Sequence, residues 1–460
     1  MTAVGPSPAE RSLRQRLVHG ASWALAGRLL AMPVQLLIAM LLSRLLEPTA
    51  LGAYFLAMSL IALGTIFGLV GLARPIVKLV PTALAAGRPA AARHVVIVSF
   101  TTTIAASLVL ALLLVTPIGR WLADAVDDRG ELAVALPLVA AILIAFALID
   151  LAAETLRGFE DLKSASFLTN GLVQRILATA CFAIMFLIGM TSSLSGVLAI
   201  MLAASVMVAV CAVMLVWRQL QALPAVGAPW PASHIVAHGP PFVVIGLNVW
   251  LLAGADLWAL GFSRSTDEIA LYGAAARMAV LVGAPLLICN AIVGPVVAEL
   301  HARGRSADLE RTARSSATLS LIAAAGATLI FWLAGGPILD LLLGRPYGAA
   351  APLLVILALG QVARVVAGPA PLVLSMTGYQ RDVMLVGILT SLLTLLALVL
   401  LAPRFGGYGV AWAITGSIAG HSLVLALIVR IRLRVLTIAA PHPRDLAMLV
   451  TALMRTFRRA

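Results

Sequence analysis

The sequence predicts an all-α integral membrane protein with about 12 transmembrane helices, packed as two parallel six-helix bundles around a central cavity. Three observations lead to this fold class: an apolar composition, a regular series of long apolar runs, and motifs that recur in the two halves of the chain. Of the 460 residues, 62% are hydrophobic and only 11% are charged. Soluble domains carry roughly 25% charged residues, so this composition excludes a water-soluble fold.

The charge balance indicates a membrane surface, and no nucleic acid, as the partner of the basic residues. The sequence holds 32 Lys and Arg against 19 Asp and Glu, a formal net charge of +13. These basic residues lie mainly between apolar runs, where they favour the cytoplasmic side of a membrane. The cysteines at positions 181, 211 and 289 all fall inside apolar runs. No disulfide framework is therefore predicted.

The apolar runs are long enough to cross a bilayer, which requires about 20 residues each. The first run is too long for the apolar core of a signal peptide and lacks a small-x-small cleavage site, so we interpret it as a membrane helix. Placing both termini in the cytoplasm puts most basic residues, Arg175 among them, on the cytoplasmic side. The predicted spans are 17–42, 52–77, 95–117, 132–156, 166–190, 194–217, 238–261, 270–298, 315–334, 349–374, 383–402 and 408–429.

Short motifs recur at an offset of about 220 residues and divide the chain into two halves. The segment 50–54 recurs as 270–274, and the segment 158–161 recurs as 378–382. Because each half holds an even number of helices, both enter the membrane from the same side, and parallel repeats of this kind are a transporter architecture. The predicted organisation is an N-terminal bundle (1–222), a cytoplasmic linker (223–237), a C-terminal bundle (238–432) and a basic cytoplasmic tail (433–460).

Five segments carry a family resemblance: 41–54 (LLSRLLEPTALGAY), 68–74 (GLVGLAR), 156–160 (LRGFE), 271–275 (LYGAA) and 337–344 (PILDLLLG). They resemble the oligosaccharide flippases of bacterial polysaccharide synthesis, in the superfamily that also holds multidrug extruders and the lipid II flippase. The resemblance implies a polyprenyl-diphosphate-linked oligosaccharide as substrate, moved by alternating access to the outer leaflet of the bacterial cytoplasmic (inner) membrane. It also implies a monomer, with polysaccharide-assembly proteins as candidate partners. Many such flippases have fourteen helices, whereas this sequence predicts twelve.

Four arginines fall inside predicted spans, where a charged residue costs about 2.5–3.5 kcal/mol on insertion scales. They must therefore face a partner or a wet cavity. A guanidinium can hold a phosphate through two parallel hydrogen bonds, so these arginines, and the glutamines that share a helix face with them, are candidates for substrate binding. Structural salt bridges remain the alternative, as does an interfacial position for Arg74. The candidate substrate-binding residues are Arg28, Gln35, Arg74, Arg277, Gln361 and Arg364.

Three acidic residues in predicted spans are candidates for charge pairing or for a coupling ion. Asp150 and Glu154 are four residues apart and share a helix face. Glu154 also precedes Arg157 by three residues, so a local ion pair is the simpler interpretation. Asp256 has no charged neighbour in the sequence, and we expect it either to pair with a cavity arginine or to bind a coupling ion.

No catalytic residue, metal site or cofactor is predicted, because the sequence contains no Gly-rich phosphate loop and no nucleophile elbow. Two alternatives to the flippase stay open. A cation-coupled drug or metabolite exporter of the same superfamily would need carboxylates in its cavity for a cationic substrate. A membrane glycan polymerase would need a sizeable outer loop with acidic residues, and the predicted outer loops are short.

Overall fold

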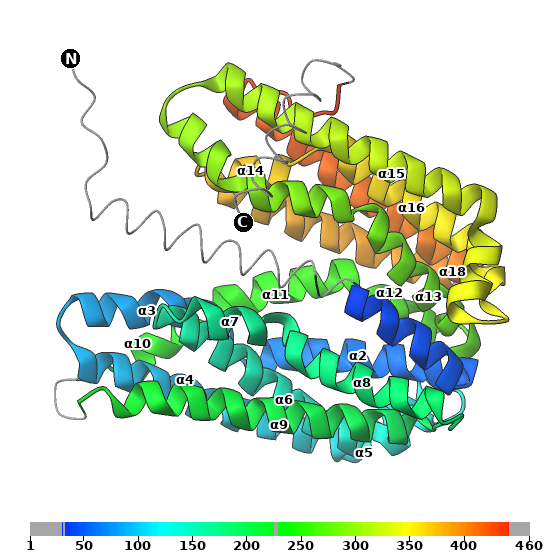
Figure 1. The fold of residues 1–460 in the computed structure, drawn as a ribbon, viewed down its shortest axis with the longest axis horizontal. Helices are drawn as coiled ribbons and strands as arrows, with labels where there is room; N and C mark the ends of the chain where they lie inside the picture. Colours follow the sequence, from blue (N-terminus) through cyan, green and yellow to red (C-terminus); the bar gives the residue numbers. More distant parts are fainter. Residues whose placement is uncertain (1–29, 31–32, 225–228, 441–460) are drawn as a thin grey trace.

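The computed structural model describes residues 30, 33–224 and 229–440, and its regular elements over these residues are helices. Figure 1 shows two layers of long helices, the first half of the chain below and the second half above. The first half comprises the helix Pro33–Leu45, α2 (Pro48–Gly68), α3 (Ala73–Ala85), α4 (Pro89–Val115), α5 (Pro117–Asp124), α6 (Glu131–Gly158), α7 (Leu162–Leu168), η1 (Thr169–Gly171), α8 (Leu172–Leu187) and α9 (Leu194–Gln221).

The second half follows a short connecting helix, α10 (Ala232–Val236). It comprises α11 (Pro240–Ala253), α12 (Ala255–Gly261), α13 (Thr266–Val282), α14 (Ala284–Ala302), α15 (Ser306–Leu343), η2 (Tyr347–Ala350), α16 (Ala351–Ala367), α17 (Ala370–Met376) and α18 (Gln380–Leu433). Over the described residues, nine helices, or up to ten if the bent pair of α7 and α8 is one span, are long and apolar enough to cross a membrane. The chain is therefore a multi-pass helical membrane protein, as the composition predicts.

The count over the described residues is lower than the twelve predicted because the first predicted span, 17–42, lies partly outside them and because the last two predicted spans are joined in one element. Gly254 divides the predicted span 238–261 into α11 and α12, and Gly283 divides the span 270–298 into α13 and α14. The two last predicted spans, in contrast, form the single element α18, which turns at Gly406 with a φ of 56°. The arms of α18 on either side of Gly406 contact each other through Thr394 and Ser417. A positive φ suits glycine because it has no Cβ.

Each half is built around one central helix. In the first half α6 packs against α2, α3, α4 and α9, and in the second half α16 packs against α13, α15 and α18. Small residues allow this close packing: a Cβ on Gly64 of α2 would lie only 2.0 Å from Cδ1 of Leu143 on α6. Without such contacts the helices would gain little from association, since lipid tails are as apolar as leucine.

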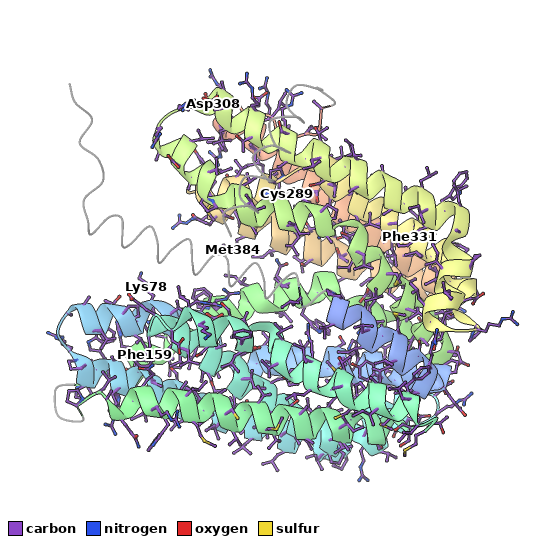
Figure 2. All side chains as sticks on the ribbon, viewed as in Figure 1. Lys78, Phe159, Cys289, Asp308, Phe331 and Met384 are labelled. Atoms are coloured by element: carbon purple, nitrogen blue, oxygen red, sulfur yellow. The ribbon has the colours of Figure 1, made fainter. Side chains whose placement is uncertain are left out.

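Corresponding loops of the two halves lie at the same end of the molecule. Figure 2 shows Lys78 and Phe159 of the first half and Asp308 of the second toward one end, and Phe331 toward the other. We call the end near Lys78 and Asp308 the basic end, since Arg88 and Arg305 also lie in its loops. The opposite end, where α2 and α13 begin, is called the gate end.

Residues 434–440 form a strap that returns from the end of α18 to the second half. Arg434 adopts a left-handed conformation with a φ of 55°, which turns the chain back. The buried Thr437 donates from Oγ1 to the carbonyl of Ala367 over 2.8 Å, and the amide of Ala439 donates to the carbonyl of Val366 over 3.0 Å. The strap therefore packs against the C-terminal end of α16. At this point Gly368 separates α16 from α17.

Candidate functional site

The two halves are latched together at the gate end. Thr266, the first residue of α13, donates from Oγ1 to Asp127 over 3.1 Å and also to Asp128, both in the loop before α6. This hydrogen bond holds the pKa of the Asp128 carboxyl below its usual range. The backbones approach closely here, because a Cβ on Gly52 of α2 would lie 2.2 Å from the carbonyl oxygen of Thr266. We call Asp127, Asp128 and Thr266 the gate latch.

Helix α11 lies between the two layers (Figure 1) and touches both. Ser59 of α2 forms hydrogen bonds at the C-terminal end of α11. Its hydroxyl donates to the carbonyl of Gly254 over 3.1 Å and accepts from Nε1 of Trp258 over 3.2 Å. The Ser59 carbonyl accepts from Nε1 of Trp250 over 3.0 Å. On its other side, α11 contacts α18 through a hydrogen bond between Asn248 and Ser391. The helix therefore connects the two halves.

Two arginines from different halves converge on Tyr54 of α2. Arg277 lies on α13 with its guanidinium carbon 4.0 Å from the centroid of the Phe55 ring. Arg175 lies on α8, and both arginines interact electrostatically with Tyr54. Neither guanidinium has an assigned hydrogen bond or ion pair within the part of the chain that the structure describes. Arg277 also interacts electrostatically with Asp256, and Arg175 with Asp150, so each of the two like charges has a carboxylate in its surroundings.

The other candidate arginine of the second half, Arg364, lies on α16 with Gln361 one turn before it. Both side chains point at Gly283, the break between α13 and α14. The buried Oε1 of Gln361 has no hydrogen-bond partner among the described residues. The sequence-predicted pair on one helix face is thus present, and it faces a backbone break that the sequence analysis did not foresee.

Two of the three acidic candidates have hydrogen-bond or ion-pair partners in the structure. Asp256 accepts a hydrogen bond from the Tyr272 hydroxyl over 2.8 Å and from the amide of Leu257 over 2.9 Å. Glu154 forms an ion pair with Arg157 at 2.6 Å, the local pairing that the sequence favours. Asp150 on α6 interacts electrostatically with Glu154 and with Arg175. Among the described residues, no group of three or more His, Cys, Asp and Glu could hold a metal ion.

The remaining predicted residues do not join this site. Arg74 is exposed at the start of α3, and Gln35 is exposed on the helix Pro33–Leu45. Arg28 lies outside the described residues. Arg175 was missed because it was counted with the loop charges, although it falls inside the predicted span 166–190 and lies on α8.

A histidine pair also escaped the sequence analysis. His234 and His238, four residues apart beside α10, have ring centroids separated by 4.9 Å. Nδ1 of His238 lies 2.7 Å from the carbonyl oxygen of His234. The four-residue spacing in the sequence would have revealed this pair.

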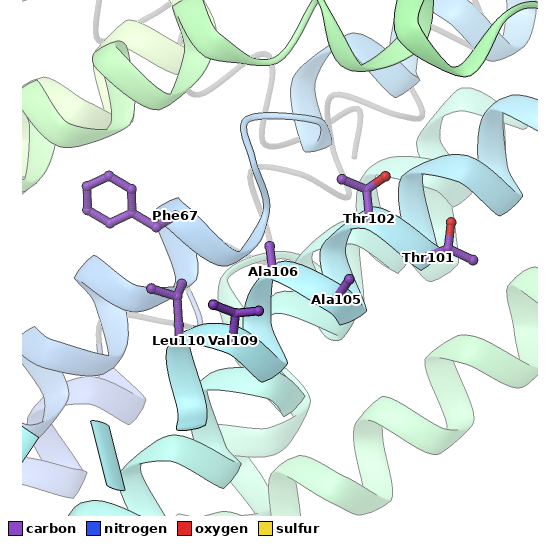
Figure 3. Close-up of a pocket in the computed structure, with 7 residues that line it drawn as sticks. All are labelled: Phe67, Thr101, Thr102, Ala105, Ala106, Val109 and Leu110. Atoms are coloured by element: carbon purple, nitrogen blue, oxygen red, sulfur yellow. The ribbon is translucent and has the colours of Figure 1, made fainter. Parts of the chain in front are cut away.

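A separate cavity of about 650 Å³ lies between α2 and α4 (Figure 3). Its lining is apolar except for two threonine side chains, and it carries no charged group. The cavity therefore suits an apolar group and cannot bind an anion. The lining residues are Phe67, Thr101, Thr102, Ala105, Ala106, Val109 and Leu110.

Solved structures share this fold at low sequence identity. An inward-facing multidrug resistance transporter of the MATE family, in the MOP superfamily, is 15% identical with a TM-score of 0.70, over 88% of this chain and 94% of that chain. The lipid II flippase MurJ, in an inward closed conformation, is 15% identical with a TM-score of 0.70, over 94% of this chain and 91% of that one. An outward-facing MATE transporter is 15% identical with a TM-score of 0.57, over 91% and 95%.

The sequence itself matches a family profile over residues 41–352, which is more than half of the chain. The profile is described as a polysaccharide biosynthesis protein. No curated protein sequence matches the chain. The profile match and the shared transporter fold confirm the resemblance seen in the sequence. The chain belongs to the Polysacc_synt_3 family of polysaccharide biosynthesis proteins, and its fold is shared with transporters of the MOP superfamily.

Proposed function

We propose that the protein flips a polyprenyl-diphosphate-linked oligosaccharide from the cytoplasmic to the outer leaflet of the bacterial inner membrane. The observation that carries this proposal is the position of Arg277 of the second half, 4.0 Å from the Phe55 ring of the first half and within electrostatic range of Arg175. A guanidinium keeps its charge in any plausible environment and its planar fork fits a phosphate. The diphosphate head group would accept hydrogen bonds from both guanidinium groups.

The acidic residues support an anionic substrate over a cationic one. A drug exporter would need free carboxylates, but Asp256 is engaged by Tyr272 and Glu154 by Arg157. Removing a partner from such a buried group leaves an uncompensated charge, which is costly. These two carboxylates are thus better explained as structural groups than as ligands for a cationic drug or a coupling ion.

The proposed transport cycle places the basic end in the cytoplasm, because positively charged loops stay on that side. Both termini are then cytoplasmic, in keeping with the twelve spans that the sequence predicts. In this proposal the gate latch closes the outer end, as expected of an inward-facing state. In support, the TM-score is higher with the inward-facing MATE transporter (0.70) than with the outward-facing one (0.57).

The test replaces Arg277 in cells that depend on this protein for their surface glycan. Arg277→Ala should abolish or severely reduce surface glycan at matched membrane abundance, and Arg277→Lys should be intermediate because lysine keeps the charge but loses the fork. Arg303→Ala is the matched control, since Arg303 is exposed and forms an ion pair with Glu299 on its own helix end. Wild-type glycan from Arg277→Ala would refute the proposal.

A further inference from the structure

At the gate end, the helix Pro33–Leu45 meets the last turn of α15. Nη2 of Arg44 donates to the carbonyl oxygen of Leu341 over 2.7 Å, a hydrogen bond between the first half and the second. The last four carbonyl groups of a helix lack intrahelical partners, so Leu341 offers an acceptor to a donor from outside its helix. The carboxylate of the neighbouring Asp340 accepts from the amide of Gly348 over 2.8 Å. Arg44 thus reaches the second half through a backbone carbonyl.

The same helix end is attached to its own half. The carbonyl of Leu45 accepts from the amide of Ser192, in the loop between α8 and α9, over 3.0 Å. The guanidinium carbon of Arg44 also lies 5.7 Å from the centroid of the Phe186 ring, near the end of α8. A guanidinium over an aromatic face is attracted by the electrons of the ring. Arg44 therefore has a partner in each half.

The internal repeat provides a comparison for Arg44. Arg44 and Arg264 each follow a serine and lie 220 residues apart, at the offset of the other repeated motifs. Nη2 of Arg264 donates to the carbonyl of Pro403 over 3.0 Å, within the second half. Pro403 follows the fifth predicted span of its half, and Phe186 lies near the end of the fifth predicted span of the first half. The two arginines thus stand beside corresponding helix ends, but Arg264 bonds within its half and Arg44 bonds across the halves.

We propose that Arg44 is a gate residue: it bridges the halves while the gate end is closed, and it stays beside Phe186 in its own half when the gate end opens. This inference rests on the proposed transport cycle and extends it. Opening requires α15 to move away from the helix Pro33–Leu45. A separation of about an ångström is enough to break the hydrogen bond to Leu341. This bond therefore stabilises the closed state alone, whereas the bond of Arg264 is the same in both states.

The test measures the distance between spin labels at Met190 and Arg345 in the purified full-length protein, each replaced by cysteine in a cysteine-free background. Both residues are exposed and belong to different halves. Arg44→Ala should lower the ratio of closed to open protein about fivefold, as expected for the loss of one exposed hydrogen bond. Arg264→Ala is the matched control, because it removes the same side chain from a bond within one half, and it should leave the ratio unchanged.

Both arginines are exposed, so neither alanine variant leaves a buried charge unpaired, and both should fold. If Arg44→Ala does not fold, Arg44→Lys replaces it: lysine keeps the charge but loses the planar fork, and the ratio should fall about twofold. A wild-type ratio in the Arg44 variant, or an equal fall in Arg264→Ala, would overturn the proposal. Because the measurement needs no substrate, a lowered ratio in a protein that moves no glycan would refute the flippase and keep the gate residue.

Discussion

Gly52→Ala should wedge the gate end open, because α2 and α13 approach there without room for a methyl group. The new Cβ would lie 2.2 Å from the Thr266 carbonyl oxygen and 2.8 Å from its Cγ2, whereas ordinary contact begins at 3.4 Å. The closer partner is backbone, so relief requires the two halves to separate by about an ångström. Such overpacking costs about 1–3 kcal/mol. Because only the closed gate bears this cost, the closed population should fall about 5- to 150-fold relative to the open one.

The assay is a spin-label distance measurement between Asp124 and Ser265, each replaced by cysteine in a cysteine-free protein. Both positions are exposed at the gate end and belong to different halves. Gly52→Ala should move the distance distribution toward longer separations. Gly326→Ala is the matched control on α15, where a Cβ meets nothing within 4 Å. A wild-type distribution in Gly52→Ala, in a folded protein, would show that the two halves are not in close contact here.

Two more predictions concern the contacts between the halves. Ser59→Ala leaves the Trp258 indole N–H and the Gly254 carbonyl without their partner, so the free energy of unfolding should fall by about 2 kcal/mol; an unchanged thermal midpoint in detergent would contradict this. Since the pKa of Asp128 is lowered by Thr266, the latch should be strongest above the ordinary aspartate pKa and weaken as the pH falls through the lowered value. Thr266→Val should remove that acid dependence from the spin-label distances, and a persistent dependence would assign it to another group.

The sequence predicts the membrane class and the positions of most helices, because composition and apolar run length depend on the bilayer alone. The sequence does not predict features that depend on contacts between elements distant in the chain. Pro285 is a local signal for the break at Gly283, whereas the predicted span around Gly254 contains no proline near the break. Ser59 contacts the break at Gly254, and side chains of α16 contact the break at Gly283. The periodicity of apolar residues within one helix does not reveal such distant partners.

The residues of the candidate site were predictable from the sequence, but their partners were not. Arg277, Arg364 and Gln361 could be selected because polar groups within apolar runs are costly and therefore informative. The engagement of Asp256 by Tyr272 could not be predicted, since the two residues lie on different helices on either side of a loop. Arg175 was predictable in principle, because the run that contains it had already been assigned to the membrane.

The strap at 434–440 has a consequence for the order in which the second half matures. Its partners on α15 and α16, including the Thr318 hydroxyl and the Val366 and Ala367 carbonyls, are synthesised more than 60 residues earlier in the chain. Until residues 434–440 have been synthesised, these groups lack their hydrogen-bond partners in the strap, and chaperones or proteases can reach them. Quality control of this protein at the membrane should therefore recognise a late, nearly complete intermediate in which α15–α18 are inserted but the break at Gly368 is still uncovered.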